Sequence, residues 1–221
     1  MSEILITGAG SGLGRELAIE YAKKNNQIIL IGRTMKTLEI TAKKVEKIGS
    51  VADIYLCDIS NISSIEKMIS DVVEKYKKID CLINNAGIGY FGALEEISLD
   101  EINTMIDINV KGTILVTKKL LPYINEKIIN IISTAGLRGK VNESVYVASK
   151  FAIRGFTESL QKEFNDNDIS IISVYMGGMD TPFWDNSNHI KDRSKLMSPS
   201  KIAKEIVCSA DKTKKIVIER D

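Results

Sequence analysis

Seven short apolar runs, rich in Ile, Val and Leu, alternate along the chain with longer segments of helical period, and this alternation constrains the fold most strongly. Nearly continuous apolar strands are typical of a parallel sheet that is buried on both faces, because right-handed crossovers place helices there. The pattern therefore predicts an α/β fold, a doubly wound sheet of seven parallel strands flanked by helices on both faces. The expected strands are Glu3 to Thr7, Gln27 to Gly32, Asp53 to Cys57, Cys81 to Asn84, Ile128 to Ser133, Ser170 to Tyr175 and Lys215 to Glu219.

The intervening segments predict six helices, near 13 to 25, 35 to 48, 62 to 77, 98 to 122, 146 to 165 and 199 to 210. A chain of 221 residues that is 44% hydrophobic is long enough for one sizeable core, and no linker-like tract divides it. We expect a single domain over residues 1–221. The stretch from Asp180 to Ser198 lacks clear periodicity and contains an aromatic pair, which favours a functional loop.

Charge and composition narrow the class of partner. Thirty basic and 29 acidic residues give a formal net charge of +1, so the chain shows no bias toward nucleic acid or anionic membrane. No apolar run approaches the roughly 18 residues that a membrane span needs, and the first residues lack the features of a secretory signal. We therefore expect a small-molecule partner, no nucleic acid and no membrane.

Three cysteines carry little functional signal. They are odd in number and lack metal-ligand spacing, and Cys57 and Cys81 lie in apolar runs. We expect these two thiols to be buried in the core, in a protein of the reducing cytoplasm, and we expect no metal site.

A glycine-rich turn, "TGAGSGLG", joins the first strand to the first helix. Gly8, Gly12 and Gly14 would allow a tight turn, close approach of a pyrophosphate to backbone N–H groups, and close packing of the helix on the strand. The helix N-terminus would add partial positive charge. Glycines at a strand-to-helix turn can also be purely structural, so the triplet alone does not decide the matter.

Tyr146 and Lys150 are four residues apart at the expected start of a helix, so their side chains share one face. A cation about 4 Å from a phenol, at an effective dielectric constant near 20, contributes roughly 4 kcal/mol, or about three pKa units. We expect Lys150 to lower the pKa of Tyr146 toward neutrality, where a general acid is most useful. Ser133, at the carboxyl end of the fifth strand, could hold a carbonyl oxygen. Such Tyr and Lys pairs are also common on solvated helix faces.

Four motifs in order, TGxxxGxG, "NNAG" at 84 to 87, Ser133 in "IISTAG" and "YVASK" at 146 to 150, resemble the short-chain dehydrogenase/reductase family over almost the whole chain. The resemblance implies a Rossmann-type fold that binds a nicotinamide dinucleotide and transfers hydride to or from a carbonyl or hydroxyl group. It implies a catalytic tetrad of Asn109, Ser133, Tyr146 and Lys150. It places the adenine contact at Asp58 and makes Asn84 and Asn85 a support of the sheet beside the cofactor.

The resemblance also implies that backbone distortion at Asn109 holds a water that links Lys150 to solvent. The full set of expected cofactor-binding residues comprises Gly8, Ser11, Gly12, Leu13, Gly14, Arg33, Thr34, Asp58, Ile59, Asn85, Ala86, Gly87, Tyr146, Lys150, Gly177, Met179 and Thr181.

The choice of cofactor depends on the end of the second strand, "IILIGRT". A site specific for NAD places an acidic residue there, whereas this chain has Arg33, whose planar fork suits a 2′-phosphate, followed by the hydroxyl of Thr34. We expect NADP to be favoured, with NAD possible. Arg33 could instead stack over the adenine, and Ser11 stands where many NADP-dependent relatives carry a basic residue.

The substrate side departs from the family pattern. Met176-Gly177 replaces the usual Pro-Gly after the sixth strand, and the segment from Pro182 to Ser198 is short for a substrate lid, which suggests an open pocket. Phe183 and Trp184 could form the apolar wall of the pocket or anchor the loop to the core. His189 has no ligand partners in the sequence and is expected to be a solvated loop residue.

The sequence therefore predicts an NADP-preferring oxidoreductase that acts on a small-molecule carbonyl or secondary alcohol, with Tyr146 as general acid or base. The alternative is a non-catalytic NADPH-binding sensor, which would need the glycine turn but not the proton donor. The long segments 98 to 122 and 146 to 165 correspond in the family to an interface, so we expect a homodimer or homotetramer.

Overall fold

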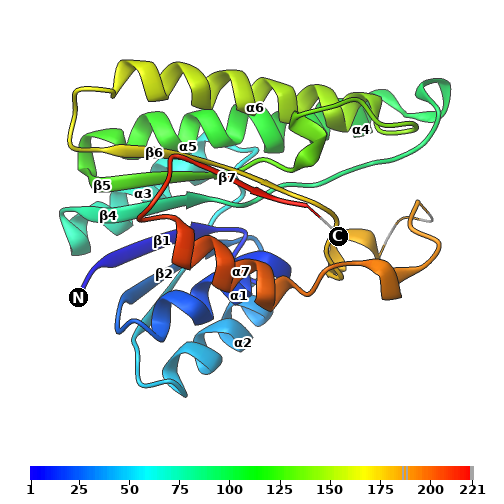
Figure 1. Ribbon diagram of the computed structural model, residues 1–221. Coiled ribbons are helices and arrows are strands. Elements are labelled where there is room, and N and C mark those ends of the chain that lie inside the picture. Colours follow the sequence, from blue (N-terminus) through cyan, green and yellow to red (C-terminus); the bar gives the residue numbers. More distant parts are fainter. Residues whose placement is uncertain (186, 188, 220–221) are drawn as a thin grey trace.

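The computed structural model describes residues 1–185, 187 and 189–219 and contains a seven-stranded sheet in the order β3-β2-β1-β4-β5-β6-β7 (Figure 1). Every neighbouring pair of strands is parallel, so the predicted doubly wound α/β fold is confirmed. The strands are β1 (Glu3–Thr7), β2 (Gln27–Gly32), β3 (Ala52–Leu56), β4 (Ile79–Asn84), β5 (Ile124–Ile131), β6 (Ser170–Met176) and β7 (Lys215–Ile218).

The strand ends differ from the sequence prediction mainly in β5. This strand begins four residues earlier than expected, because exposed polar residues near its start do not belong to an apolar pattern. It also ends at Ile131, so Ser133 lies beyond the strand rather than in it. Strand β3 starts and ends one residue earlier than predicted, and β4 starts two residues earlier.

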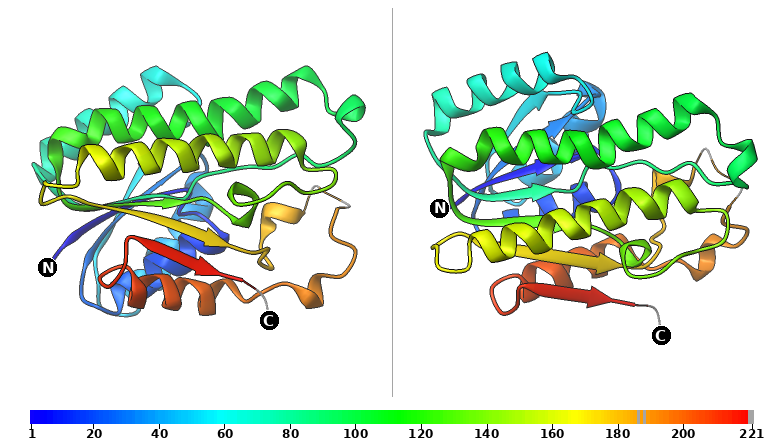
Figure 2. Two further views of the ribbon diagram at one scale, coloured as in Figure 1. Left: turned by 45° about the horizontal axis from the view of Figure 1, so that its top comes forward. Right: turned by 90° about the horizontal axis from the view of Figure 1, so that it is seen from above.

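Helices cover both faces of the sheet (Figure 2). Helices α1 (Gly12–Ala22), α2 (Met35–Glu46) and α7 (Pro199–Ser209) pack over one face, and the buried side chains of Leu30 and Ile206 belong to this layer of the core. Opposite them lie α3 (Ile62–Tyr76), α4 (Leu99–Ile106), α5 (Thr113–Leu120) and α6 (Ser144–Glu163). Ile29 and Ile31 point into this second layer, as the two-residue period of a strand requires.

The segment predicted as one helix over 98 to 122 is interrupted. Helix α4 ends at Ile106, a π-helical segment (η2) runs over Asp107–Gly112, and α5 follows from Thr113. The wider turn lets the Asn109 side chain reach the backbone of Ile88, and a Cβ on Gly112 would lie only 2.5 Å from the Ile59 carbonyl oxygen. A residue inserted into a helix is typical of functional sites.

Short 3₁₀ turns join the larger elements, at η1 (Leu94–Glu96), η3 (Leu121–Tyr123), η4 (Thr134–Gly136), η5 (Pro182–Trp184) and η6 (Arg193–Lys195). The chain reverses its direction across the sheet between β1 and β4, whose outgoing connections diverge to opposite sides. In a sheet of this kind the carboxyl ends of the strands at that switch point form the natural ligand crevice. Asn186 and Asn188, which belong to the predicted functional loop, lie outside the described residues, as do Arg220 and Asp221.

Candidate active site

A cavity of about 500 Å³ opens along the carboxyl ends of the strands. One end is lined by the glycine turn and by the residues after β2 and β3, and the other by Ser133, the start of α6 and the segment after β6. Most of the predicted site residues line it, namely Gly8, Ser11, Gly12, Leu13, Arg33, Thr34, Asp58, Ile59, Asn85, Ala86, Gly87, Ser133, Tyr146, Lys150, Gly177, Met179 and Thr181.

The glycine turn is shaped by backbone that excludes side chains. Gly8 and Gly12 have φ values of +66° and +50°, which favour glycine. A Cβ on Gly8 would stand 2.9 Å from the Ala86 Cα atom. Gly14 was expected among the cofactor-binding residues but does not line the cavity. It lies beneath the turn, where an added Cβ would be 2.3 Å from the Gly8 carbonyl oxygen. Its role is the close packing of α1 on the turn.

The NNAG segment holds this turn in place. The Asn85 side-chain amide donates to the Thr7 carbonyl at 2.9 Å, and the Thr7 hydroxyl accepts from the backbone N–H groups of Asn85 and Ala86 at 3.0 and 3.1 Å. Asn84 is buried below and its amide nitrogen donates to Thr117 and Asn130, each at 2.8 Å. Two adjacent asparagines thus tie the turn to the sheet and to α5.

Charged and polar groups gather after β2 and β3. Arg33 and Thr34 are exposed at the cavity margin, and Asp58 faces the same end. Partial burial would raise the pKa of Asp58, but hydrogen bonds from the Ser60 hydroxyl and N–H, together with the positive charge of Arg33, lower it overall. The Asp58 carboxylate is therefore ionised and close enough to Arg33 for the two charges to interact.

Ser133, Tyr146 and Lys150 meet at the other end of the cavity. Tyr146 and Lys150 are buried in the first turns of α6, and the Lys150 ammonium lies 5.6 Å from the centre of the Tyr146 ring. It donates to the Ile131 carbonyl at 3.4 Å. Ser133 has a φ of 112°, which is unfavourable for a residue with a side chain and is typical of a functional position.

We expected Lys150 to lower the pKa of Tyr146 toward neutrality, and this is wrong for the protein without a bound cofactor. Burial raises the pKa of the phenol well above its usual value, a hydrogen bond with Ser133 opposes this shift, and the charge of Glu143 adds to it. Burial also lowers the pKa of Lys150, to about 8. Both groups are buried, and desolvation is the largest cause of each shift, so burial rather than the pairing of the two residues dominates their pKa values.

Asn109 is buried within the π-helical segment and does not line the cavity. Its side-chain oxygen accepts from the Ile88 N–H at 2.8 Å, and its amide donates to the Ile88 carbonyl at 2.8 Å and to the Ser149 hydroxyl at 3.0 Å. The residue therefore connects the chain after β4 to the first turns of α6, close to Lys150. A water relay at this position stays a prediction.

The aromatic pair after β6 fills both of the roles that the sequence left open. Trp184 is buried, its indole N–H donates to the Met179 carbonyl at 3.0 Å, and its ring stacks on Phe91 at 5.0 Å. Phe183 is half-buried and lies 5.8 Å from the Tyr146 ring. Trp184 anchors the loop and also lines the cavity, and Phe183 forms the part of the cavity wall beside Tyr146.

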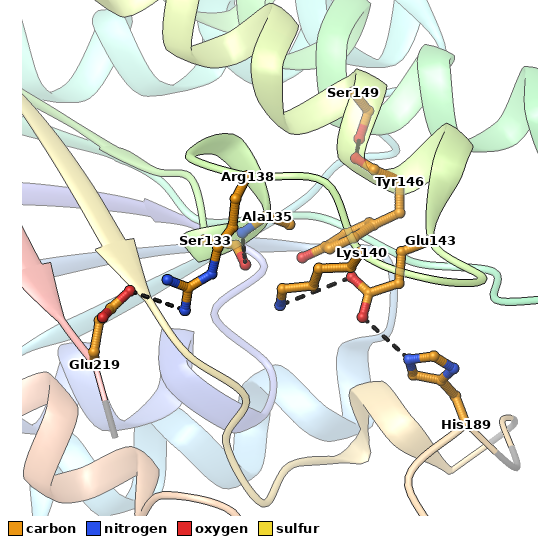
Figure 3. Close-up of polar contacts among 9 residues, drawn as sticks. All are labelled: Ser133, Ala135, Arg138, Lys140, Glu143, Tyr146, Ser149, His189 and Glu219. Carbon is orange, nitrogen blue, oxygen red and sulfur yellow. Dashed lines mark hydrogen bonds and ion pairs between the residues drawn. The ribbon is translucent and has the colours of Figure 1, made fainter. Parts of the chain in front are cut away.

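A charged cluster beside Tyr146 was not predicted (Figure 3). His189 is half-buried rather than solvated, and its Nε2 atom lies 3.1 Å from the Glu143 carboxylate, which also pairs with Lys140 at 3.9 Å. Lys140 and Glu143 line the cavity. The available signal was the position of Glu143, which precedes Tyr146 by three residues and therefore lies one helical turn before it.

Comparisons with known proteins place the chain in a family. A family model described as short chain dehydrogenase matches residues 2–192. The chain is 30% identical to the sepiapterin reductase of Chlorobaculum tepidum, over 98% of this chain and 93% of that relative. The chain therefore belongs to the short chain dehydrogenase family and is an oxidoreductase.

Solved structures agree with this assignment. An alcohol dehydrogenase from Thermococcus sibiricus, complexed with 5-hydroxy-NADP, matches with a TM-score of 0.90 and 25% identity, over 100% of this chain and 96% of that chain. The 3-ketoacyl-(acyl-carrier-protein) reductase of Brucella melitensis, complexed with NADH, matches with a TM-score of 0.89 and 27% identity over the same shares. Among the described helices of this chain, none is long and apolar enough to cross a membrane.

Proposed function

We propose that the protein is an NADP-preferring reductase that interconverts a carbonyl group and a secondary alcohol on a small molecule. One observation carries the proposal. The hydroxyls of Ser133 and Tyr146 and the ammonium of Lys150 line the same cavity as the glycine turn and Arg33. Groups suited to proton transfer and the backbone recess at the glycine turn therefore belong to one cavity, which supports the proposal.

The residues at the turn end fit a dinucleotide. At Gly8 a side chain would collide with the chain after β4, and at Gly12 an added Cβ would lie 3.2 Å from Thr181, so these glycines keep a backbone recess at the start of α1. Gly8, Ser11 and Gly12 would hold the phosphates, Asp58 and Ile59 the adenine end, and Gly177, Met179 and Thr181 the nicotinamide end. When bound, the cofactor supplies hydride to the carbonyl carbon of the substrate.

Tyr146 would supply the proton. Because burial raises the pKa of its phenol, Tyr146 keeps its proton at neutral pH and can act as a general acid toward a carbonyl oxygen. Ser133, whose strained backbone presents its hydroxyl beside the phenol, would hold that oxygen. Lys150 would bind the cofactor ribose and stabilise the phenolate that remains after proton transfer.

Arg33 supports the preference for NADP. It is exposed at the cavity margin, where its guanidinium is available to form charge-assisted hydrogen bonds with a 2′-phosphate. No acidic residue takes this position at the end of β2, so nothing there would repel the phosphate. Asp58 lies at the end of the neighbouring strand β3 and is already engaged by Ser60 and the charge of Arg33.

A screen tests the proposal. Purified protein would be mixed with NADPH or NADH and a panel of ketones, aldehydes, quinones and sugars, while nicotinamide absorbance is followed. We expect oxidation of NADPH with at least one carbonyl class, at a higher kcat/KM than with NADH. Tight NADPH binding without any oxidation across the panel would favour the sensor alternative, in which the dinucleotide is a signal and not a reactant.

A further inference from the structure

The cavity has a charged corner that the proposed proton transfer does not use. It consists of Lys140 and Glu143, which precede and cap α6, and of His189 from the segment after β6 (Figure 3). Lys140 and Glu143 line the same cavity as Ser133 and Tyr146. A substrate that places its carbonyl on those two hydroxyls would therefore share the cavity with this corner.

Glu143 is the fixed centre of the corner. Its side chain is only 7% exposed, and a buried carboxylate requires compensating partners. One oxygen lies 3.1 Å from His189 Nε2, and the other lies 3.9 Å from Lys140 Nζ. His189 is held further by stacking on Phe91, with ring centres 4.9 Å apart. Both carboxylate oxygens already have protein partners, so Glu143 positions its neighbours.

Lys140 differs from Glu143 because its donors are not used up within the protein. Its side chain is 31% exposed, and among the described residues its ion pair is the one with Glu143, at a distance beyond hydrogen-bond length. Figure 3 shows its amine extending toward Ser133 and the Tyr146 phenol. An ammonium group has three N–H donors and no acceptor, so its matching ligand atom is an anionic or strongly polar oxygen.

The geometry points to an oxo acid as the substrate, with its carbonyl oxygen on Ser133 and Tyr146 and its carboxylate on Lys140. The inference rests on the proposed reductase function and names its substrate class. The cation rather than the carboxylate is the recognition group, because Glu143 is buried and paired while Lys140 presents unfilled donors to the cavity. Phe183 and the neighbouring aromatic rings would cover the apolar part of the acid.

The experiment compares acids with their own esters. A series of 2-oxo, 3-oxo and 4-oxo acids, each paired with its methyl ester, would be reduced with NADPH by the wild type and by Lys140→Met. In the wild type we expect kcat/KM for the best acid to exceed that for its ester about tenfold or more. In Lys140→Met this ratio should fall about tenfold, through KM for the acid, with the ester unchanged.

Two further variants separate charge from structure. Lys140→Arg keeps the cation and should retain most of the preference for the acid, whereas Lys212→Met removes an exposed lysine outside the cavity and should change neither substrate. Esters reduced as well as acids, or an equal loss for both in Lys140→Met, would overturn this inference and leave the reductase function standing. Failure to reduce any acid or ester, together with no activity on the broader carbonyl panel, would overturn both.

Discussion

The two ends of the cavity are built in different ways. At the dinucleotide end the surface is backbone, and its shape follows from glycines with positive φ and from amide hydrogen bonds between β1 and the segment after β4. At the substrate end the surface is side chain, assembled from Tyr90, Glu143, Phe183 and Trp184. These four residues come from three separate connections of the chain.

This difference explains which end can change. A backbone recess tolerates few substitutions, so one cofactor class is retained while the side chains opposite it can vary with little effect on the fold. The two ends meet at Tyr146, which lies on the regular helix α6 and faces both. Substitutions at one end of the cavity, or at Tyr146 between the two ends, show whether the other end responds.

Substitution of Tyr146, where the two ends of the cavity meet, should have the largest effect on turnover. Tyr146→Phe keeps the ring that packs against Phe91 and removes only the phenolic oxygen. We expect turnover to fall by roughly 10² to 10⁴, the usual contribution of a general acid, while NADPH affinity stays within a few-fold. Stopped-flow kinetics and fluorescence titration of NADPH would measure the two separately. Wild-type turnover in the variant would remove Tyr146 from the mechanism.

Arg33→Asp alters the dinucleotide end alone. The substitution removes a cation and adds a carboxylate beside the 2′-phosphate, so the preference for NADPH over NADH should change by roughly several kcal/mol and reverse. Arg33→Ala, which removes the cation without adding a negative charge, should give an intermediate preference. Unchanged relative affinities in titrations of both variants would show that Arg33 does not discriminate between the cofactors.

The buried Lys150 should make the free energy of unfolding depend on pH. Burial lowers the pKa of this lysine to about 8 in the folded protein, below the ordinary value of 10.5. Between these pH values the unfolded chain binds more protons, so the free energy of unfolding should rise with pH, by at most about 3 kcal/mol. Below pH 8 both states are protonated and this contribution is constant.

Urea unfolding of the wild type and of Lys150→Met, each without cofactor, tests this dependence. The variant lacks the titrating group, so its free energy of unfolding relative to the wild type should decrease as the pH rises from 7.5 to 10. Lys212→Met, at an exposed site, serves as the matched control and should parallel the wild type. If the free energy of unfolding of Lys150→Met changed with pH in parallel with that of the wild type, burial would not lower the pKa of Lys150.

The smallest predicted effect concerns the support of the glycine turn. In Gly14→Ala the new methyl would stand 2.3 Å from the Gly8 carbonyl oxygen, a backbone atom, so we expect a loss of about 1–3 kcal/mol in stability and weaker NADPH binding. In Gly155→Ala the new methyl meets nothing within 4 Å on an exposed face of α6, and a gain of about 0.5–1 kcal/mol is expected. Thermal unfolding would measure the Tm of both variants. Equal changes in Tm would show that packing under the turn is unimportant.

The sequence predicted the dinucleotide end well because its requirements are local. Strand β1 and the positive-φ turn at Gly8 and Gly12 are read from neighbouring residues, and the structure has both where expected. The resemblance implied backbone distortion at Asn109, and the π-helical segment lies there. The helical period over 98 to 122 did not show this break, because it depends on contacts of Asn109 with Ile88, across 21 residues of sequence. A helical period alone does not reveal such a tertiary requirement.

The substrate end was predicted poorly for the same reason. His189 was expected to be solvated, and only the folded chain brings it to Glu143, 46 residues away in sequence. The pKa of Tyr146 was expected to fall, because pair spacing along a helix gives proximity to Lys150 but not the extent of burial. For Trp184 and Phe183 the sequence left two roles open, because it does not show that Trp184 is buried and bound to the Met179 carbonyl while Phe183 lies beside Tyr146.

Transfer of deuterium from labelled cofactor to product would show whether the protein passes hydride directly to a carbonyl carbon. NADPH carrying deuterium at one face of C4 would be incubated with the wild-type protein and a carbonyl compound that it reduces, and the alcohol would be examined by mass spectrometry and NMR. We expect one deuterium, on the carbinol carbon, from only one of the two labelled faces, and loss of this product in Tyr146→Phe. An alcohol without deuterium for either label would contradict direct reduction in this cavity.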